Sequence, residues 1–221
     1  MTAIERAARP LRADARTNRD KLLRAAAELF AAHGLEVSLN EVARAAGVGI
    51  ATLQRNFASR EDLVAAVFLE RVIQYADVAT ETAAADDPWL GFRDFVERVC
   101  RMQQEDRGFA AVLTTDFPDV QELQAHRRRA LREFTGLVER AKAAGALRKD
   151  FSPHDLPLIL LANAGVVVGT GASAAKASRR VVAMLLRACA AGDDAPLPPA
   201  PPPRALLASL RHDRTTATGR R

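Results

Sequence analysis

Cysteine and aromatic residues are scarce in this chain of 221 residues. Only Cys100 and Cys189 are present, far apart in the sequence, so neither a disulfide framework nor the paired spacing of a zinc site is indicated. Aromatic residues make up 5% of the chain, strand-like runs of β-branched residues are rare, and alanine recurs throughout. The composition favours an all-α fold without a metal site, and the low cysteine content is typical of the reducing cytoplasm.

Long apolar runs are also missing. The N-terminus alternates arginine, alanine and acidic residues without the apolar core of a signal peptide. The longest apolar candidate, residues 156–168, falls short of the ~18 residues of a membrane span and contains Asn163 and Gly165. We therefore expect no membrane association.

Catalytic motifs are not found either. The sequence has no phosphate-binding loop, no metal-ligand histidine pair and no nucleophile elbow, so we expect no enzyme and no cofactor. Residues 169–174 match a dinucleotide fingerprint, follow three valines, and precede Asp193 by about 20 residues. That fold needs further parallel strands, and only a proline-rich tail remains, so we reject this interpretation.

Positive charge is concentrated near the N-terminus. Residues 1–60 hold ten Arg and Lys against six Asp and Glu, within a chain of net charge +5. Such a segment suits a polyanionic partner, although this net charge is also common in ordinary soluble proteins. Residues 1–14 are predicted to form a flexible basic arm, which either contacts DNA or is a solvated tail without a role.

Helix start and stop signals divide most of the chain. Capping boxes are predicted at Thr17 with Asp20, Ser38 with Glu41, and Ser59 with Asp62, and Asp87-Pro88 starts a further helix. About nine helices are expected, at 17–33, 38–46, 50–57, 59–85, 88–99, 108–115, 120–144, from Ser152-Pro153 or Pro157 to 168, and 173–191.

Residues 38–57 carry the pattern of a helix-turn-helix. Val42 and Ala43 are small apolar residues where two helices would cross, and Gly47 permits a tight turn. Val48, Leu53 and Phe57 would anchor the second helix to the core. The remaining side chains near its N-terminal end can then enter a major groove: Ile50, Ala51, Thr52, Gln54 and Arg55.

From residue 16 to residue 67 the sequence resembles the TetR family of bacterial regulators. Three segments carry the resemblance in the right order and spacing: LLRAAAELF at 22–30, VARAAGV at 42–48, and TLQRNFASREDL at 52–63. The resemblance implies a three-helix helix-turn-helix DNA-binding domain at 15–75 and a helical ligand-binding and dimerisation domain at 76–192. The proline-rich tail at 193–221 is expected to be largely disordered.

The resemblance also implies DNA contacts. Base contacts, or contacts to the nearby backbone, fall on Asn40, Ile50, Ala51, Thr52 and Gln54; phosphate contacts fall on Thr17, Arg55, Asn56 and Arg60, joined by Ser38 at a helix start. Gln54 replaces a tyrosine common in the family, and Ala51 replaces a glycine. Gln54 could bind adenine through two hydrogen bonds, whereas Ile50 could touch a thymine methyl group or pack in the core with Phe57.

A ligand site and a dimer interface are expected in the C-terminal part. An apolar pocket for a small apolar effector could be lined by Trp89, Phe92, Phe95, Met102, Phe109, Leu113, Phe117 and Phe134, with Asn163 as an orienting polar group; the alternative, which the sequence favours for most of them, is that they are ordinary core. By resemblance, the last two helices would form a homodimer interface that includes Gly165, Gly169, Val181 and Leu185. Residues 126–129, His-Arg-Arg-Arg, are either a solvated helix face or an anion site.

The sequence therefore predicts a dimeric, ligand-responsive repressor that binds a pseudo-palindromic operator in double-stranded DNA with two recognition helices ~34 Å apart. Two alternatives remain open. One is a helical small-molecule-binding protein or enzyme with an incidental helix-turn-helix. The other is a DNA-bound regulator that acts through protein contacts alone and has a filled core in place of a pocket.

Overall fold

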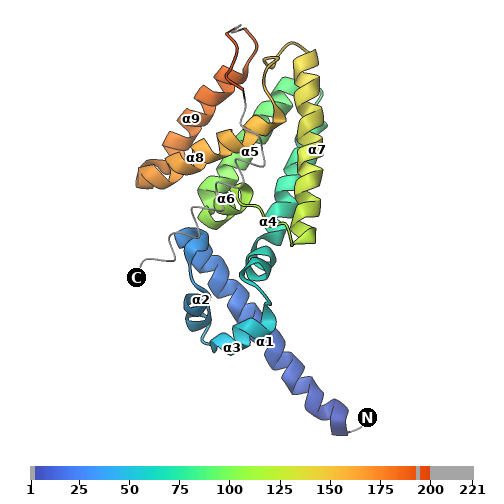
Figure 1. The fold of residues 1–221 in the computed structure, drawn as a ribbon, viewed down its shortest axis with the longest axis vertical. Helices are drawn as coiled ribbons and strands as arrows, with labels where there is room; N and C mark the ends of the chain where they lie inside the picture. Colours follow the sequence, from blue (N-terminus) through green and yellow to red (C-terminus); the bar gives the residue numbers. More distant parts are fainter. Residues whose placement is uncertain (1–2, 193–194, 200–221) are drawn as a thin grey trace.

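The computed structural model describes residues 3–192 and 195–199, and in this part the chain forms nine α-helices and no strand beyond one isolated bridge (Figure 1). The helices are α1 (Ala3–His33), α2 (Leu39–Ala45), α3 (Ile50–Asn56), α4 (Arg60–Ala83), α5 (Pro88–Glu105), α6 (Arg107–Thr114), α7 (Gln121–Ala143), α8 (Leu156–Thr170) and α9 (Ala174–Cys189), with short 3-10 helices η1 (Gly34–Glu36), η2 (Pro153–Asp155) and η3 (Gly171–Ser173). The predicted all-α class is confirmed.

Local capping chemistry fixes several helix starts where the sequence predicted them. Ser38 and Ser59 each form a complete capping box, which satisfies backbone donors at the starts of α2 and α4. Asp87 accepts hydrogen bonds from the amides of Trp89 and Leu90, and Pro88 occupies the first position of α5.

The first helix begins earlier than predicted. α1 starts at Ala3, so Thr17 lies inside the helix instead of capping it, and residues 3–14 continue the helix instead of forming a flexible arm. Alanine and arginine, which dominate this stretch, are strong helix formers. Extending a helix that already exists is also much easier than nucleating a new one.

The proline-rich tail was expected to be disordered. Residues 193–194 and 200–221 lie outside the described residues, so this expectation concerns mainly a part that the structure does not describe. Residues 195–199 carry no helix and are held to the body at two points. The amide of Leu197 donates to Asp150 Oδ2 at 2.8 Å, and Arg148 Nη2 donates to the carbonyl of Ala195 at 2.7 Å.

α4 joins the two halves of the molecule. Figure 1 shows α1, α2 and α3 at one end of the protein, with α4 leading from them into the C-terminal helices. Phe68 of α4 stacks on Phe30 of α1, with ring centroids 6.0 Å apart. Gly108 of α6 lies against the Phe68 ring and the backbone of Phe30, at a place where a Cβ atom would come within 2.5 Å of Phe68 Cζ. The N-terminal and C-terminal parts are therefore closely packed at this junction.

One stretch, Pro153–Cys189, is long and apolar enough to cross a membrane by length and composition alone. In the structure it is divided: α8 has 15 residues and α9 has 16, and Gly171 between them adopts a φ of +49°. Each helix is shorter than the ~20 residues that span a bilayer. The apolar character of the stretch therefore needs another explanation, which the outer face of α8 and α9 provides below.

Candidate functional site

α2 and α3 form the predicted helix-turn-helix. Gly47 has a φ of +68°, the left-handed conformation that a tight turn requires and that glycine adopts without a steric penalty. Val42, Ala43, Leu53 and Phe57 are buried and anchor both helices to the core. The residues chosen for packing and for the turn therefore have the roles that the sequence predicted.

The opposite face of α3 points to solvent. Ala51, Gln54 and Arg55 are exposed, and Thr52 is half-buried. Ile50 is 37% exposed, so the alternative that it packs in the core is wrong. Arg55 Nη2 donates to Thr52 Oγ1 at 3.1 Å, which holds the guanidinium along the outer surface of the helix. This face offers an amide, a cation and small apolar groups to a partner.

The start of α2 lies beside this face. The amide and hydroxyl of Ser38 donate to Glu41 Oε2 at 2.8 and 2.7 Å, and Asn40 is exposed in the first turn. Because the backbone and the hydroxyl of Ser38 bind its ionised form, the pKa of Glu41 lies below its ordinary value. The hydroxyl of Ser38 is therefore committed to capping the helix.

Two of the predicted phosphate contacts make internal bonds. Asn56 Nδ2 donates to the carbonyl of Thr52 at 2.8 Å, and the guanidinium of Arg60 donates to the carbonyl of Leu35. Both therefore stabilise the helix-turn-helix itself. Thr17, another predicted phosphate contact, is exposed on α1.

Arg19 positions α3, a role that was not predicted from the sequence. Its Nη1 donates to the carbonyl of Asn56 at 3.1 Å, and its guanidinium lies 4.4 Å from the centroid of the Phe57 ring. This side chain of α1 thus fixes the C-terminal end of α3. No local signal could have revealed the contact, because the partners lie 37 residues apart in the chain.

Most residues predicted to line an apolar pocket are packed against one another. The rings of Phe92, Phe95 and Phe134 are fully buried, and their centroids lie 4.8 Å (Phe95 to Phe134) and 5.8 Å (Phe92 to Phe134) apart. Trp89 stacks on Phe92 at 5.7 Å, and Phe151 meets Phe92 edge-on at 5.3 Å. These rings pack against one another as an aromatic core.

The other predicted lining residues are distributed differently. Phe109 and Phe117 are buried in the same hydrophobic cluster, and Leu113 is half-buried against it. Met102 is buried but reaches the floor of the groove between α4 and α5 described below.

Asn163 is the centre of a buried polar network that joins three helices. Its Nδ2 donates to Gln103 Oε1 at 2.8 Å and to the carbonyl of Cys100 at 3.2 Å, both on α5. Its Oδ1 accepts a hydrogen bond from Ser178 Oγ of α9 at 2.5 Å. Ser178 Oγ in turn accepts one from Gln104 Nε2 at 2.7 Å. Asn163 is therefore satisfied by the protein, and the network sets how α8 and α9 sit on α5.

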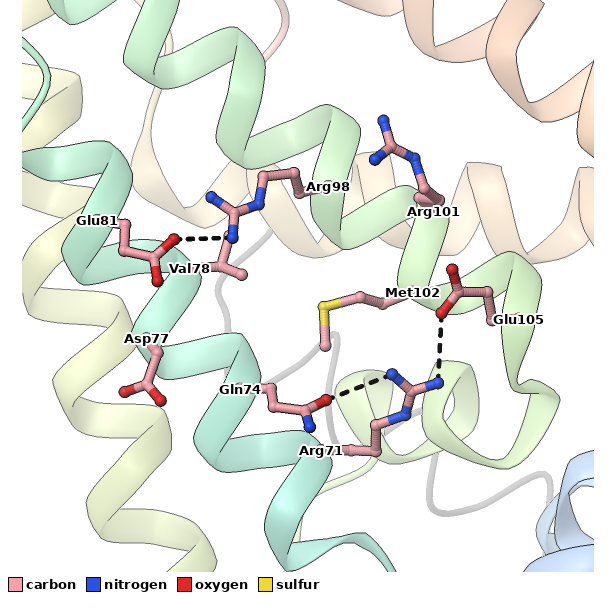
Figure 2. A pocket seen from close by; sticks show the side chains of 9 residues that line it. All are labelled: Arg71, Gln74, Asp77, Val78, Glu81, Arg98, Arg101, Met102 and Glu105. Atoms are coloured by element: carbon pink, nitrogen blue, oxygen red, sulfur yellow. Dashed lines mark hydrogen bonds and ion pairs between the residues drawn. The ribbon is translucent and has the colours of Figure 1, made fainter.

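An open groove of about 370 Å³, the α4–α5 groove, runs between α4 and α5 (Figure 2). Its apolar floor is formed by Val78 and Met102, and ion pairs cross it at both ends. Arg98 lies 2.8 Å from Glu81, and Arg71 lies 3.3 Å from Glu105. The hydrogen bond to Glu81 and the attraction of its negative charge raise the pKa of Arg98. The Arg98 guanidinium is therefore held in this ion pair.

Two arginines of the run at 126–129 make contacts within the protein. Arg127 donates to the carbonyls of Thr115 and Val112 at the end of α6, and burial lowers its pKa. Arg129 pairs with Asp77 of α4 at 2.6 Å. A fully solvated face was therefore the wrong description of these two side chains.

The outer face of α8 and α9 exposes apolar residues and, on α9, also arginines such as Arg180 and Arg187. Val168 is 58% exposed and Met184 57% exposed, and Gly165 and Gly169 also face outwards. Val181 and Leu185 of the predicted interface are half-buried. Exposed apolar side chains on two adjacent helices, with arginines beside them, favour a protein–protein interface.

Two family models match the chain. The model for bacterial regulatory proteins of the tetR family covers residues 22–67, and the model for the SbtR-like transcriptional regulator C-terminal domain covers residues 87–189. A sequence comparison with curated proteins finds no match.

Solved structures of transcription regulators are also similar. The TetR transcription regulatory protein from Mycobacterium vanbaalenii is 30% identical, over 82% of this chain and 99% of that one, with a TM-score of 0.45. SmeT, the repressor of the Stenotrophomonas maltophilia multidrug efflux pump SmeDEF, is 22% identical over 81% and 97%, with a TM-score of 0.53. FadR from Bacillus subtilis, in complex with stearoyl-CoA, is 15% identical over 75% and 96%, with a TM-score of 0.53.

The helix-turn-helix geometry, the two family models and the 30% identity over nearly the whole of a relative agree. The chain belongs to the TetR family of DNA-binding transcriptional regulators.

Proposed function

We propose that this regulator binds a pseudo-palindromic operator as a homodimer and represses transcription in the cytoplasm until a small-molecule effector lowers its affinity for DNA. The observation that carries the DNA-binding half is the solvent-facing side of α3, with Ile50, Gln54 and Arg55 on a helix anchored by buried residues. A major groove admits such a helix, and two of them about 34 Å apart match one turn of DNA.

Individual contacts are assigned by chemistry. Gln54 presents the amide that binds adenine with two hydrogen bonds, and Ile50 presents a methyl surface for thymine. Arg55 supplies a phosphate contact, as does the exposed Thr17. Asn56 and Arg60, with their internal bonds, support this function by positioning α3.

The test is binding of the full-length protein to DNA from its own upstream region, titrated against salt. Gln54→Ala should weaken selective binding about 5-fold to 150-fold and leave binding to unrelated DNA unchanged. Arg55→Ala should weaken both and reduce the salt dependence by about one phosphate contact. Arg93→Ala, an exposed arginine on α5, is the matched control and should change neither.

Two outcomes would contradict this proposal. One is selective binding that survives both substitutions in α3. The other is the lack of selective binding to every genomic fragment, which would favour the helical enzyme or binding protein with an incidental helix-turn-helix.

The outer face of α8 and α9 is our proposed dimer interface. Burying Val168 and Met184 against a second copy would remove a large exposed apolar surface from water. Light scattering should find a dimer for the wild type and a monomer for the Val168→Lys, Met184→Lys double variant. Leu90→Lys, at a residue 54% exposed on α5, is the control and should remain dimeric. A double variant that stays dimeric would place the interface elsewhere.

A small apolar effector remains a proposal. The rings of Phe92, Phe95 and Phe134 pack together with centroids 4.8 to 5.8 Å apart, so a ligand that binds among them would have to separate them. Candidate effectors that never alter operator binding would favour regulation through protein contacts alone.

A further inference from the structure

A second cavity, of about 320 Å³, lies between α5 and α9; we call it the α5–α9 cavity. We propose that it binds a small organic carboxylate, with Arg101 of α5 and Arg179 of α9 as the two cations that hold the carboxylate group. Its volume lies at the lower end of the range for small-molecule sites, which limits the ligand to a small one.

The charges around this cavity favour an anion. Arg101 and Arg179 come from different helices, line the same cavity and are both exposed. The acidic residue that lines it, Glu97, is already within 3.7 Å of Arg93. A guanidinium offers planar, paired N–H donors that match a carboxylate, so two of them across a cavity form a suitable clamp.

The inner wall suits an organic ligand better than an inorganic anion. Cys100 and Val182 are buried and give the cavity an apolar base. Burial raises the pKa of the Cys100 thiol to about 12, so this wall carries no negative charge near neutral pH. Gln104 bonds to Ser178 with one of its N–H groups, which leaves its half-exposed amide with further hydrogen-bonding capacity at the cavity wall.

The α4–α5 groove does not offer the same chemistry. Its arginines Arg71 and Arg98 are paired with Glu105 and Glu81. An added anion would therefore have to compete with these carboxylates for the two guanidinium groups. Arg101 lines both the α4–α5 groove and the α5–α9 cavity, whereas Arg179 lines the α5–α9 cavity but not the groove. Arg179 is therefore the residue that distinguishes the two sites.

A ligand bound in the α5–α9 cavity would affect the proposed dimer interface, and this step rests on the proposed function. Ser178 of the cavity wall belongs to the network that ties α9 and α8 to α5 through Asn163. A ligand that draws Arg179 towards Arg101 changes how α9 packs on α5. Since α8 and α9 carry the proposed interface, the spacing of the two recognition helices would change with it, by as much as the ligand's differential affinity allows.

The experiment is calorimetric titration of the full-length protein with benzoate and hexanoate, in the absence of DNA. The neutral isosteres benzamide and hexanamide, and inorganic phosphate, serve as comparison ligands. We expect the carboxylates to bind and the amides and phosphate to bind at least tenfold more weakly. Arg179→Gln should weaken carboxylate binding about tenfold, the value of one exposed charge-assisted contact.

The neighbouring substitution Arg180→Gln is the matched control, because Arg180 is exposed on α9 and does not line the cavity. It should leave the affinity unchanged. Equal melting temperatures of the ligand-free variants would show that both are folded.

Three results would overturn the inference: no carboxylate binding up to about 10 mM, equal binding of phosphate, or loss of binding in Arg71→Gln but not in Arg179→Gln. The last would move the site to the α4–α5 groove. Because these titrations contain no DNA, a failure of operator binding would count against the proposed function and leave the carboxylate site standing.

Discussion

Gly108 makes the junction between the two halves of the protein sensitive to a single methyl group. A Cβ atom there would lie 2.5 Å from Phe68 Cζ and 2.9 Å from the carbonyl oxygen of Phe30. Both rings are buried and stacked, so neither can move away without disturbing the core. Because one of these contacts is with a backbone oxygen, we expect a cost in the upper half of the overpacking range, about 2–3 kcal/mol, and alanine returns about 1 kcal/mol of helix propensity. The net destabilisation of Gly108→Ala is therefore about 1–2 kcal/mol.

Thermal unfolding followed by circular dichroism measures this effect. In a domain of this size each kcal/mol lowers Tm by about 2–4 °C, so Gly108→Ala should lower Tm by roughly 2–8 °C at equal protein concentration. Gly136→Ala is the control: this glycine is exposed in α7 and a Cβ atom would meet nothing within 4 Å, so Tm should rise by about 1–4 °C. A Gly108→Ala variant as stable as the wild type would refute the reasoning.

Three further predictions concern buried and charged groups. Asn163→Ala removes the centre of the polar network and leaves buried partners unsatisfied, so the free energy of unfolding should fall by about 2–4 kcal/mol in urea denaturation. Burial raises the pKa of Cys100 to about 12 and that of Cys189 to about 11, so mass spectrometry should find neither thiol alkylated by iodoacetamide in the native protein at pH 8, and both after unfolding. Hydrogen bonding by Arg148 lowers the pKa of Asp150 to about 2 from 3.8. The ionised Asp150 therefore stabilises the folded state above pH ~4, and this stabilisation is lost as the pH falls towards 2. Asp150→Asn should lower the urea midpoint at pH 6 and match the wild type near pH 2.

Local chemistry explains why much of the fold was predictable. Ser38, Ser59 and Asp87 accept hydrogen bonds from backbone amides within three residues of themselves. Their capping roles can therefore be predicted from a few neighbouring residues. The same holds for Gly47, whose turn is local. Thr17 carries the same local signal, but the prediction that it caps a helix was wrong. The residues before Thr17 also favour a helix, so α1 continues through this position.

The C-terminal site was harder to predict because it depends on distant partners. The apolar residues chosen as pocket lining have the right chemistry, but whether rings such as Phe92 and Phe134 enclose space or fill it depends on how α5 and α7 cross. The α4–α5 groove and the α5–α9 cavity are lined instead by charged residues, such as Arg98 and Arg179, which an expectation of apolar linings does not include. Asn163 was recognised as unusual, yet its partners on α5 and α9 could not be read from the sequence.

The length of α4 has a mechanical consequence. A helix of 24 residues measures roughly 36 Å, and this one has its first turns against α1 and its last turns among the C-terminal helices. A tilt of only about 5° at the upper end would carry the lower end sideways by roughly 3 Å, because an α-helix moves as a nearly stiff rod. Displacements that size, doubled across a two-fold axis, approach the spacing of two base pairs. In the proposed dimer, very small rearrangements near α5 would thus be sufficient to put the two recognition helices out of register with the two halves of an operator.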